Sequence, residues 1–396
     1  MKGRKNTFLC PGCECGKLKF FRLRGRAGPW AEVNPGCHAC LVNSSGILIV
    51  GDYTDYCYFI DRVLPSGAEK WHSTGMDTQP RQRYFSALDP HGFHRVAYNE
   101  WGQADAAHTV ICVHGLTRNS HDFDALAAEL SQTCRVVCPD VVGRGASDWL
   151  EYKNDYGFAL YQSDAAALIA RLSVASSAGG FLSALRGHPM EEDRPLQVDW
   201  VGTSMGGLIG MMLAARSGSP IRRLVLNDVG PLVPWRALRR LHLEHNNENP
   251  QFADLDEAEV YMRQACVNFG PLTDEQWRDV TRHSVILQPT GVFRLGWDPA
   301  IIGAVPEQGL EGVTLSMNFL SGIDMWPIWN KVRCPVLVLR GENSDLLTPA
   351  TVARMQASGP QVQVAEFPGV GHAPWLMSAE QISVVRDFLL AEETEP

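Results

Sequence analysis

Short apolar runs alternate with segments of helical period along most of the chain. Runs that end in glycine, proline or aspartate predict strands over residues 96–101, 109–113, 135–138, 198–201, 223–226, 335–339 and 362–367. Apolar positions three to four residues apart predict helices over residues 123–130, 158–172, 208–215, 350–357 and 379–390. Strands separated by helices are joined by right-handed crossovers, so the pattern predicts an α/β fold with a mainly parallel sheet flanked by helices. Residues 174–197 are rich in Ser, Gly and charged residues and are expected to form a loop.

The alternation stops over residues 232–322, which have helical spacing and many aromatic and acidic residues. We expect a helical cap here, inserted after the sixth strand of the fold and placed over the carboxyl edge of the sheet, where ligands bind in open α/β folds. The core then consists of residues 76–231 and 323–396.

Composition narrows the class of protein. The chain has 45% apolar and 20% charged residues and a net charge of −9, which is typical of a globular protein and argues against a nucleic-acid partner. No apolar run approaches the roughly 20 residues that span a bilayer, so no membrane association is expected. The cysteines after residue 75 lie mostly in apolar runs, as small buried side chains do, which favours a cytoplasmic location.

Residues 1–75 differ from the rest, since they hold six of the eleven cysteines. The spacing of Cys10, Cys13, Cys37 and Cys40 suits a tetrahedral zinc site, and the basic segment between the pairs would let such a module bind nucleic acid. The alternatives are a disordered tail or a true start at Met76, and we favour the last because the predicted core is complete without this segment. No cofactor is expected.

The sharpest motif is the sequence GTSMGG, in which Ser204 lies between a buried strand and a helix. This is the context of a nucleophile elbow. Gly202 and Gly206 lack side chains and allow the backbones to approach, while the start of the helix favours a developing anion.

A serine hydroxyl needs a base and the base needs a carboxylate. His372 ends a glycine-containing loop after the last predicted strand, and Asp345 follows the strand at residues 335–339. Asp228, directly after the strand at residues 223–226, is the alternative acid, and Glu342 is a further rival. We expect Asp345 to be the acid.

The oxyanion of an acyl-transfer intermediate requires two backbone N–H groups. Met205 follows the nucleophile and supplies one. The turn His114-Gly115-Leu116 after the strand at residues 109–113 points to the N–H of Leu116 as the other, with His114 in a structural hydrogen-bonding role.

These motifs resemble the α/β-hydrolase superfamily, in its cap-bearing branch of bacterial serine esterases. The resemblance covers about residues 92–396 and includes His114-Gly115, the turn from Asp140 to Ser147, the elbow, and Gly371-His372. It implies the triad Ser204, Asp345 and His372 in the family's chain order. A serine at the elbow excludes the dehalogenases and epoxide hydrolases of this fold, which use aspartate there. Thr203 and Ala373 stand where C–C hydrolases tend to carry Asn and Trp.

The predicted activity is therefore hydrolysis of a carboxylic ester with a small or medium apolar acyl group, through an acyl-enzyme. C–C bond or thioester hydrolysis on the same triad is the alternative, and a non-catalytic binding protein is a third reading that the intact triad disfavours. The expected partner is a small-molecule ester. The cap would contribute apolar side chains to its pocket, from among Trp235, Phe252, Tyr261, Met262, Phe269, Trp277, Phe293 and Trp297.

Overall fold

The computed structural model describes residues 39–42, 48–51, 79–185, 196–244, 250–303 and 322–392. The chain divides into two compact units, residues 1–73 and 74–396. In the first unit, strands β1 (Ala39–Val42) and β2 (Leu48–Gly51) pair antiparallel. The zinc hypothesis concerns the side chains of Cys10, Cys13, Cys37 and Cys40, which lie outside the described part.

An eight-stranded sheet forms the centre of the second unit, in the order β15-β14-β8-β7-β5-β6-β4-β3. Its strands are β3 (Arg81–Leu88), β4 (Phe93–Trp101), β5 (Thr109–Val113), β6 (Arg135–Pro139), β7 (Val198–Thr203), β8 (Ile221–Asn227), β14 (Val336–Gly341) and β15 (Val362–Phe367). Only β3 and β4 pair antiparallel with their neighbours, so the predicted mainly parallel α/β fold is confirmed. Strand β3 was not predicted. It lies at the sheet edge, and only Phe85 and Ala87 on it are buried, which leaves a weak apolar signal.

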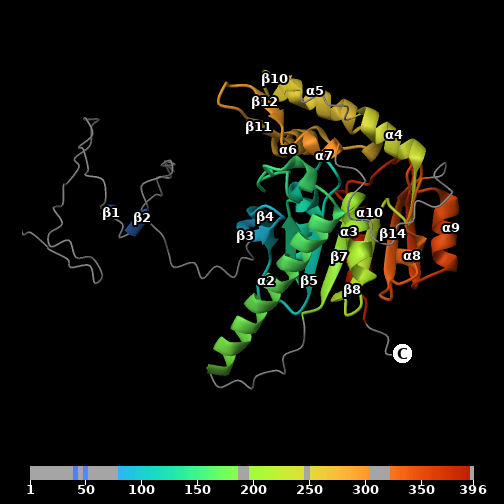
Figure 1. Cartoon of the computed structure of the whole chain (residues 1–396), viewed down its shortest axis with the longest axis horizontal. Coiled ribbons are helices and arrows are strands. Elements are labelled where there is room, and N and C mark those ends of the chain that lie inside the picture. The colour runs from blue at the N-terminus through green and yellow to red at the C-terminus, as the bar shows by residue number, and fades with distance from the viewer. Residues whose placement is uncertain are drawn as a thin grey trace, which may run out of the picture. The chain divides into compact units, whose positions relative to one another are not determined.

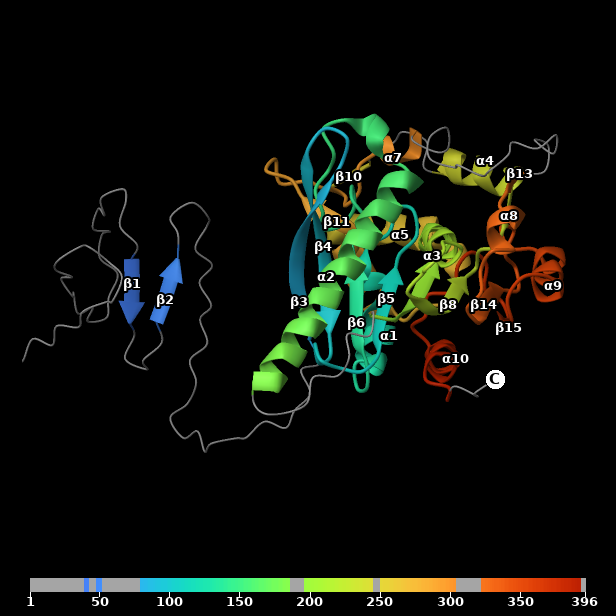
Figure 2. The same cartoon turned by 60° about the horizontal axis from the view of Figure 1, so that its bottom comes forward.

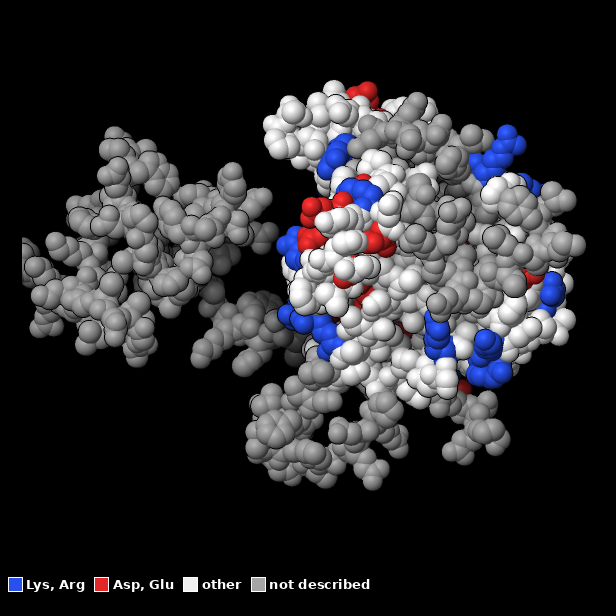
Figure 3. All heavy atoms as spheres, in the orientation of Figure 1, with Lys and Arg blue, Asp and Glu red and all other residues white. Residues whose placement is uncertain are grey.

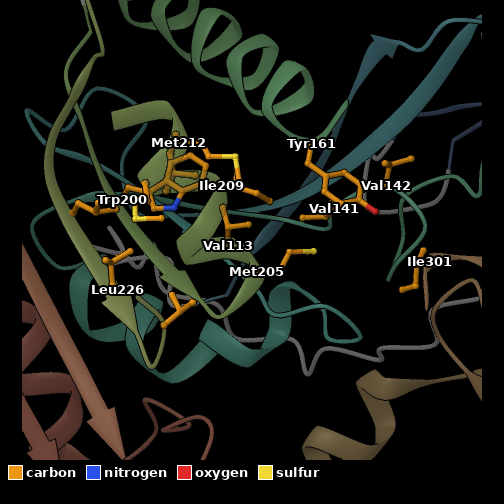
Figure 4. Close-up of a cluster of buried hydrophobic side chains, with 14 of the residues drawn as sticks. Val113, Val141, Val142, Tyr161, Trp200, Met205, Ile209, Met212, Leu226 and Ile301 are labelled. Carbon is orange, nitrogen blue, oxygen red and sulfur yellow. The ribbon is translucent and has the colours of Figure 1, made fainter. Parts of the chain in front are cut away.

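Helices cover both faces of the sheet (Figures 1 and 2). Because side chains alternate along a strand, Val110 and Cys112 of β5 join one apolar cluster and Ile111 and Val113 the other. Helices α1 (Asp124–Leu130) and α10 (Ala379–Leu389) pack on the first face. Helices α2 (Phe158–Leu185), α3 (Met205–Ala214), α8 (Trp326–Trp329) and α9 (Pro349–Ala357) pack on the second, around Trp200 and Ile209 (Figure 4).

Helix α2 corrects one expectation. Its backbone continues to Leu185, although residues from 174 onward were expected to form a loop. Ser and Gly lower helix propensity in that stretch, but no proline interrupts the chain between Phe158 and Pro189. A helix that has already formed can therefore continue.

The cap is inserted after β8, the sixth strand of the central sheet, as predicted. Its helices are α4 (Trp235–Glu244), α5 (Leu255–Ala265), α6 (Asp274–Ser284) and α7 (Ala300–Gly303), with the 3-10 turn η3 (Val267–Phe269). Figure 1 shows α4, α5 and α6 across one edge of the sheet. The N-termini of α5 and α6 are capped by Asp254 and by a capping box at Thr273.

The cap is not wholly helical, which corrects the expectation. Strands β10 (Gln251–Phe252), β11 (Val285–Leu287) and β12 (Phe293–Leu295) form a three-stranded sheet. Strands β9 (Leu232–Pro234) and β13 (Gly322–Asp324) pair where the cap leaves and rejoins the core. Segments of two or three residues are too short to show a period of two in the sequence.

No helix among the described residues is long and apolar enough to cross a membrane. On the face drawn in Figure 3, basic and acidic side chains of the described residues are interspersed.

Candidate active site

Ser204 occupies a strained turn between β7 and α3. Its φ of 50° and ψ of −112° are rare for a residue with a side chain, and it is the N-cap of α3. A Cβ on Gly202 would lie 2.4 Å from the backbone of Gly206, and one on Gly206 would lie 2.0 Å from the carbonyl oxygen of Val113. Both glycines are therefore required sterically, and the turn raises Ser204 at the carboxyl edge of the sheet.

His372 lies in the loop after β15 and reaches back to the elbow. Its Nε2 is 3.0 Å from Ser204 Oγ, and its Nδ1 is 2.7 Å from Asp228 Oδ2. The cap helps to hold this loop, because the N–H of Gly371 donates to the carbonyl of Asn268 at 2.6 Å. The structure thus brings together Ser204, His372 and Asp228.

Contrary to expectation, the structure brings Asp228 and not Asp345 into hydrogen-bond contact with His372. Asp345 lies at the end of β14, as predicted, but its carboxylate accepts hydrogen bonds of 2.8 and 2.9 Å from Arg240 in the cap. Although burial raises the pKa of Asp345, the hydrogen bonds and charge of Arg240 lower it below its usual value. The carboxylate next to His372 is the alternative one, Asp228. The other rival, Glu342, accepts from the N–H of Gly369 instead.

The carboxylate of Asp228 is buried and held by hydrogen bonds on both oxygens. The residue is fully buried directly after β8, with a φ of 55°. Its Oδ1 accepts the N–H of Gly341 at 2.9 Å, and its Oδ2 accepts the hydroxyl of Ser344 at 2.5 Å as well as His372. These donors keep the side chain in one orientation.

The turn at His114 passes beside the nucleophile, since a Cβ on Gly115 would lie 3.8 Å from the Cβ of Ser204. His114 is fully buried, and its Nε2 accepts the N–H of Val141 at 2.9 Å. Its Nδ1 therefore carries the proton and donates to the carbonyl of Gly115 at 2.7 Å. Burial, together with the charges of Arg144 and Arg118, lowers the pKa of His114 to about 3, so the ring stays neutral.

A cavity of about 400 Å³ lies over Ser204 and His372. The core contributes the turn from Gly115 to Arg118 and Trp375. The cap contributes mainly apolar and aromatic side chains, namely Tyr261, Met262, Ala265, Cys266, Phe269, Leu295 and Trp297. Phe269 packs on Trp375 with ring centroids 4.9 Å apart. Of the aromatic cap residues, Phe252 and Trp277 are instead buried in packing, and Trp235 is exposed.

The charged groups of this wall are paired. Arg118 forms a hydrogen-bonded ion pair with Asp122 and lies over the ring of Trp375. Burial lowers the pKa of Arg118, but Asp122 outweighs it and raises the pKa above its usual value. Arg240, which also lines the cavity, pairs with Asp345. The cavity is therefore an apolar site with compensated charges at its wall.

Among the described residues, two clusters could offer three ligands to a metal ion, one at His121, Asp124 and His283 and one at Asp89, His91 and Asp155. Neither includes Ser204, His372 or Asp228. The rings of His121 and His283 stack at 3.8 Å with an angle of 7°, so their nitrogen lone pairs lie in two parallel planes and do not converge on one ion.

The chain is similar to known hydrolases in sequence and in fold. Residues 110–383 match the sequence model of the alpha/beta hydrolase family. A 3-hydroxybutyrate-oligomer hydrolase from Cupriavidus necator is 39% identical over 318 residues, which are 79% of this chain and 99% of that protein. A 2-(acetamidomethylene)succinate hydrolase from Mesorhizobium japonicum is 26% identical over 65% of this chain and 79% of its own length. The crystal structure of an alpha/beta hydrolase from Novosphingobium aromaticivorans has a TM-score of 0.63 and 30% identity, covering 78% of this chain and 98% of that one.

Proposed function

Because this chain belongs to the alpha/beta hydrolase family and is a hydrolase, we propose that it cleaves carboxylic esters through an acyl-enzyme, with Ser204 as the nucleophile. The observation that carries the proposal is the continuous hydrogen-bonded path from Ser204 Oγ through His372 to Asp228. Asp228 replaces Asp345 as the proposed acid, since Asp345 is engaged by Arg240.

In the first half-reaction, Ser204 Oγ attacks the ester carbonyl carbon and its proton passes to His372 Nε2. Asp228 holds the Nδ1–H tautomer and stabilises the imidazolium. The negative charge on the substrate oxygen is met by the N–H groups of Leu116 and Met205. The bond to the alcohol oxygen then breaks as His372 returns its proton to that oxygen. Water repeats the sequence on the acyl-enzyme and releases the acid.

The relative at 39% identity supports a substrate class. It is named for hydrolysis of 3-hydroxybutyrate oligomers and shares nearly its whole length with this chain. We propose that this protein acts on esters of short 3-hydroxy acids, the simplest being a 3-hydroxybutyrate dimer. A chain of methyl-bearing ester units offers small apolar groups to the aromatic cap wall, in a cavity of about 400 Å³.

The test compares hydrolysis of the 3-hydroxybutyrate dimer and trimer with p-nitrophenyl esters of increasing chain length, an acyl-coenzyme A and a vinylogous 1,5-diketone. We expect the highest kcat/KM on the oligomers and a mid-chain optimum on the p-nitrophenyl series, since each buried methylene contributes at most about 0.8 kcal/mol until the pocket is full. Selective cleavage of the thioester or the diketone would replace the ester assignment by the corresponding alternative.

Ser204→Ala tests the proposed nucleophile. Ser383→Ala on α10 is the control, because it also removes one hydroxyl but lies away from the proposed triad. Ser204→Ala should lose nearly all turnover and all labelling by a fluorophosphonate probe, while its melting temperature stays close to wild type. His372→Ala should lose a similar amount, and the double variant little more, because triad members act as a unit. Retention of a tenth of the wild-type kcat in Ser204→Ala would exclude the mechanism.

A further inference from the structure

We propose that Arg144 is a positioning residue for the oxyanion hole. Its buried guanidinium fixes the two segments that supply Leu116 and Met205, and it places a positive charge behind the oxyanion. This inference rests on the proposed function, because it concerns the same backbone N–H groups. In the sequence, Arg144 was included only as part of the turn from Asp140 to Ser147.

The turn that carries Arg144 is sterically constrained, and Arg144 itself is buried. Gly143 and Gly145 on either side have φ values of 88° and 54°. A Cβ on Gly145 would lie 2.3 Å from the carboxyl carbon of Asp140, and Asp140 itself accepts the N–H of Ala146 at 2.8 Å. Arg144 has no exposed surface, which is rare for an arginine.

Its side chain reaches both halves of the proposed oxyanion hole. Nε donates to the carbonyl of Leu116 at 2.8 Å, and Nη2 lies 3.6 Å from the thioether sulfur of Met205. Nη1 donates to the carbonyl of Val142 at 2.7 Å and to the hydroxyl of Tyr161 at 3.0 Å. Figure 4 shows Val142, Tyr161 and Met205 in one buried cluster. The planar fork of the guanidinium thus spans the turn after β5 and the start of α3.

Arg144 and His114 fix Leu116 from its two sides. His114 Nδ1 holds the carbonyl of Gly115, which belongs to the same peptide group as the N–H of Leu116. In a trans peptide the C=O and N–H point in opposite directions, so this bond aims the N–H of Leu116 away from His114. Arg144 holds the next carbonyl, that of Leu116 itself. Two successive peptide planes are therefore set before substrate binds.

The positive charge of Arg144 is buried without a negative partner in the described part of the chain. Among the described residues no carboxylate lies within ion-pair distance of it, and its acceptors are carbonyls, a hydroxyl and a sulfur. Buried charges are ordinarily paired, so a buried cation without a counter-charge costs stability. A cation at this place is compensated when a negative charge develops on the substrate oxygen, because the interaction is strong in a site that excludes water.

Backbone atoms of the turn, and not the Arg144 side chain, hold the cap at this point. The N–H of Gly145 donates to the carbonyl of Gly296, and the N–H of Asp298 donates to the carbonyl of Gly143. Arg144 forms an isolated backbone bridge with Trp297. These contacts belong to the backbone and survive replacement of the Arg144 side chain, so the side chain can be tested separately from the attachment of the cap.

The test uses Arg144→Met, which removes the charge and the donors, and Arg144→Lys, which keeps the charge but loses the fork. Tyr161→Phe is the control, because it removes one partner of the guanidinium and leaves its contacts with Leu116 and Met205. For each we would measure kcat and KM on an ester, the inhibition constant of a trifluoromethyl ketone that forms a tetrahedral adduct, and the melting temperature.

We expect Arg144→Met to lower kcat about tenfold to a hundredfold, approaching the loss of one oxyanion donor. KM should change little, and affinity for the trifluoromethyl ketone should fall by the same factor as kcat. Arg144→Lys should lie between this variant and wild type, and Tyr161→Phe should stay close to wild type.

A kcat for Arg144→Met within about threefold of wild type, or a loss of affinity shared equally by the substrate and the ketone, would overturn the inference. If Arg144→Met does not fold, Arg144→Lys carries the same comparison, and failure of both to fold would assign Arg144 to stability alone. Fluorophosphonate labelling of Ser204 in the wild-type protein tests the proposed function separately from these ratios.

Discussion

Replacing Asp228 by asparagine tests the triad most directly, because the change is nearly isosteric and the alternative acid offers a matched control. Asp228 accepts the N–H of Gly341 through Oδ1 and His372 Nδ1 through Oδ2. An asparagine can keep only one of these bonds. If its oxygen stays with Gly341, its NH₂ group faces His372 and donates to Nδ1. The imidazole proton then moves to Nε2, where it prevents His372 from accepting the proton of Ser204.

The expected loss in kcat for Asp228→Asn is about 10⁴-fold, as for the wrong tautomer in comparable triads. That factor corresponds to about 5.4 kcal/mol in the activation free energy. Stability should fall by about 1–3 kcal/mol, the cost of one buried group left without its partner.

Asp345→Asn is the control at the end of the neighbouring strand. Asp345 and Arg240 form a partly exposed ion pair, with side-chain exposures of 39% and 29%. Such pairs contribute about 0–1 kcal/mol to stability. We expect kcat to stay within about threefold of wild type, because the hydrogen bond between His372 and Asp228 is untouched.

The assay is initial-rate kinetics on one p-nitrophenyl ester across pH 5 to 9, with melting temperatures measured in the same buffers. Folded Asp228→Asn protein with wild-type kcat would refute the assignment of Asp228. A large loss in Asp345→Asn with a small one in Asp228→Asn would move the acid to Asp345 and show that Arg240 releases it during turnover.

Three further predictions concern the elbow, the buried histidine and the first unit. Gly206→Ala should abolish activity and lower the melting temperature, because its Cβ would lie 2.0 Å from the carbonyl oxygen of Val113. Gly92→Ala is the control and should change neither, because no atom lies within 4 Å of the added Cβ. Wild-type activity in Gly206→Ala would contradict the steric argument. The pKa of His114 is about 3 when folded against 6.5 ordinarily, so the unfolded chain binds a proton that the folded chain excludes, and stability is lost as pH falls from about 6.5 to about 3. In denaturant titrations over this pH range, the unfolding free energy of the wild type should change with pH more steeply than that of His114→Asn, by up to about 1.4 kcal/mol per pH unit; equal slopes in both proteins would exclude this contribution. A chain that begins at Met76 should fold and keep full activity without zinc, and about one equivalent of zinc in the full-length protein, or loss of activity on truncation, would count against this.

The sequence was sufficient wherever the determinant is local. Buried strands appear in the sequence as apolar runs, so β5, β7 and β14 were predicted close to their observed bounds. The elbow is a steric requirement of consecutive residues, and Gly202 and Gly206 mark it whatever the rest of the chain does. The family and the mainly parallel sheet followed from these features, and both are confirmed.

Tertiary structure alone decided which carboxylate faces His372. Strands β8 and β14 are parallel neighbours in the sheet, so Asp228 and Asp345 both follow strands that end at the same edge. Spacing along the chain cannot separate them. The choice depends on the backbone at Asp228, with its φ of 55°, and on Arg240 of the cap, which engages Asp345. The contacts of Arg144 with Leu116 and Met205 are equally invisible in the sequence, because a buried arginine and its acceptors meet only when three separate turns pack together.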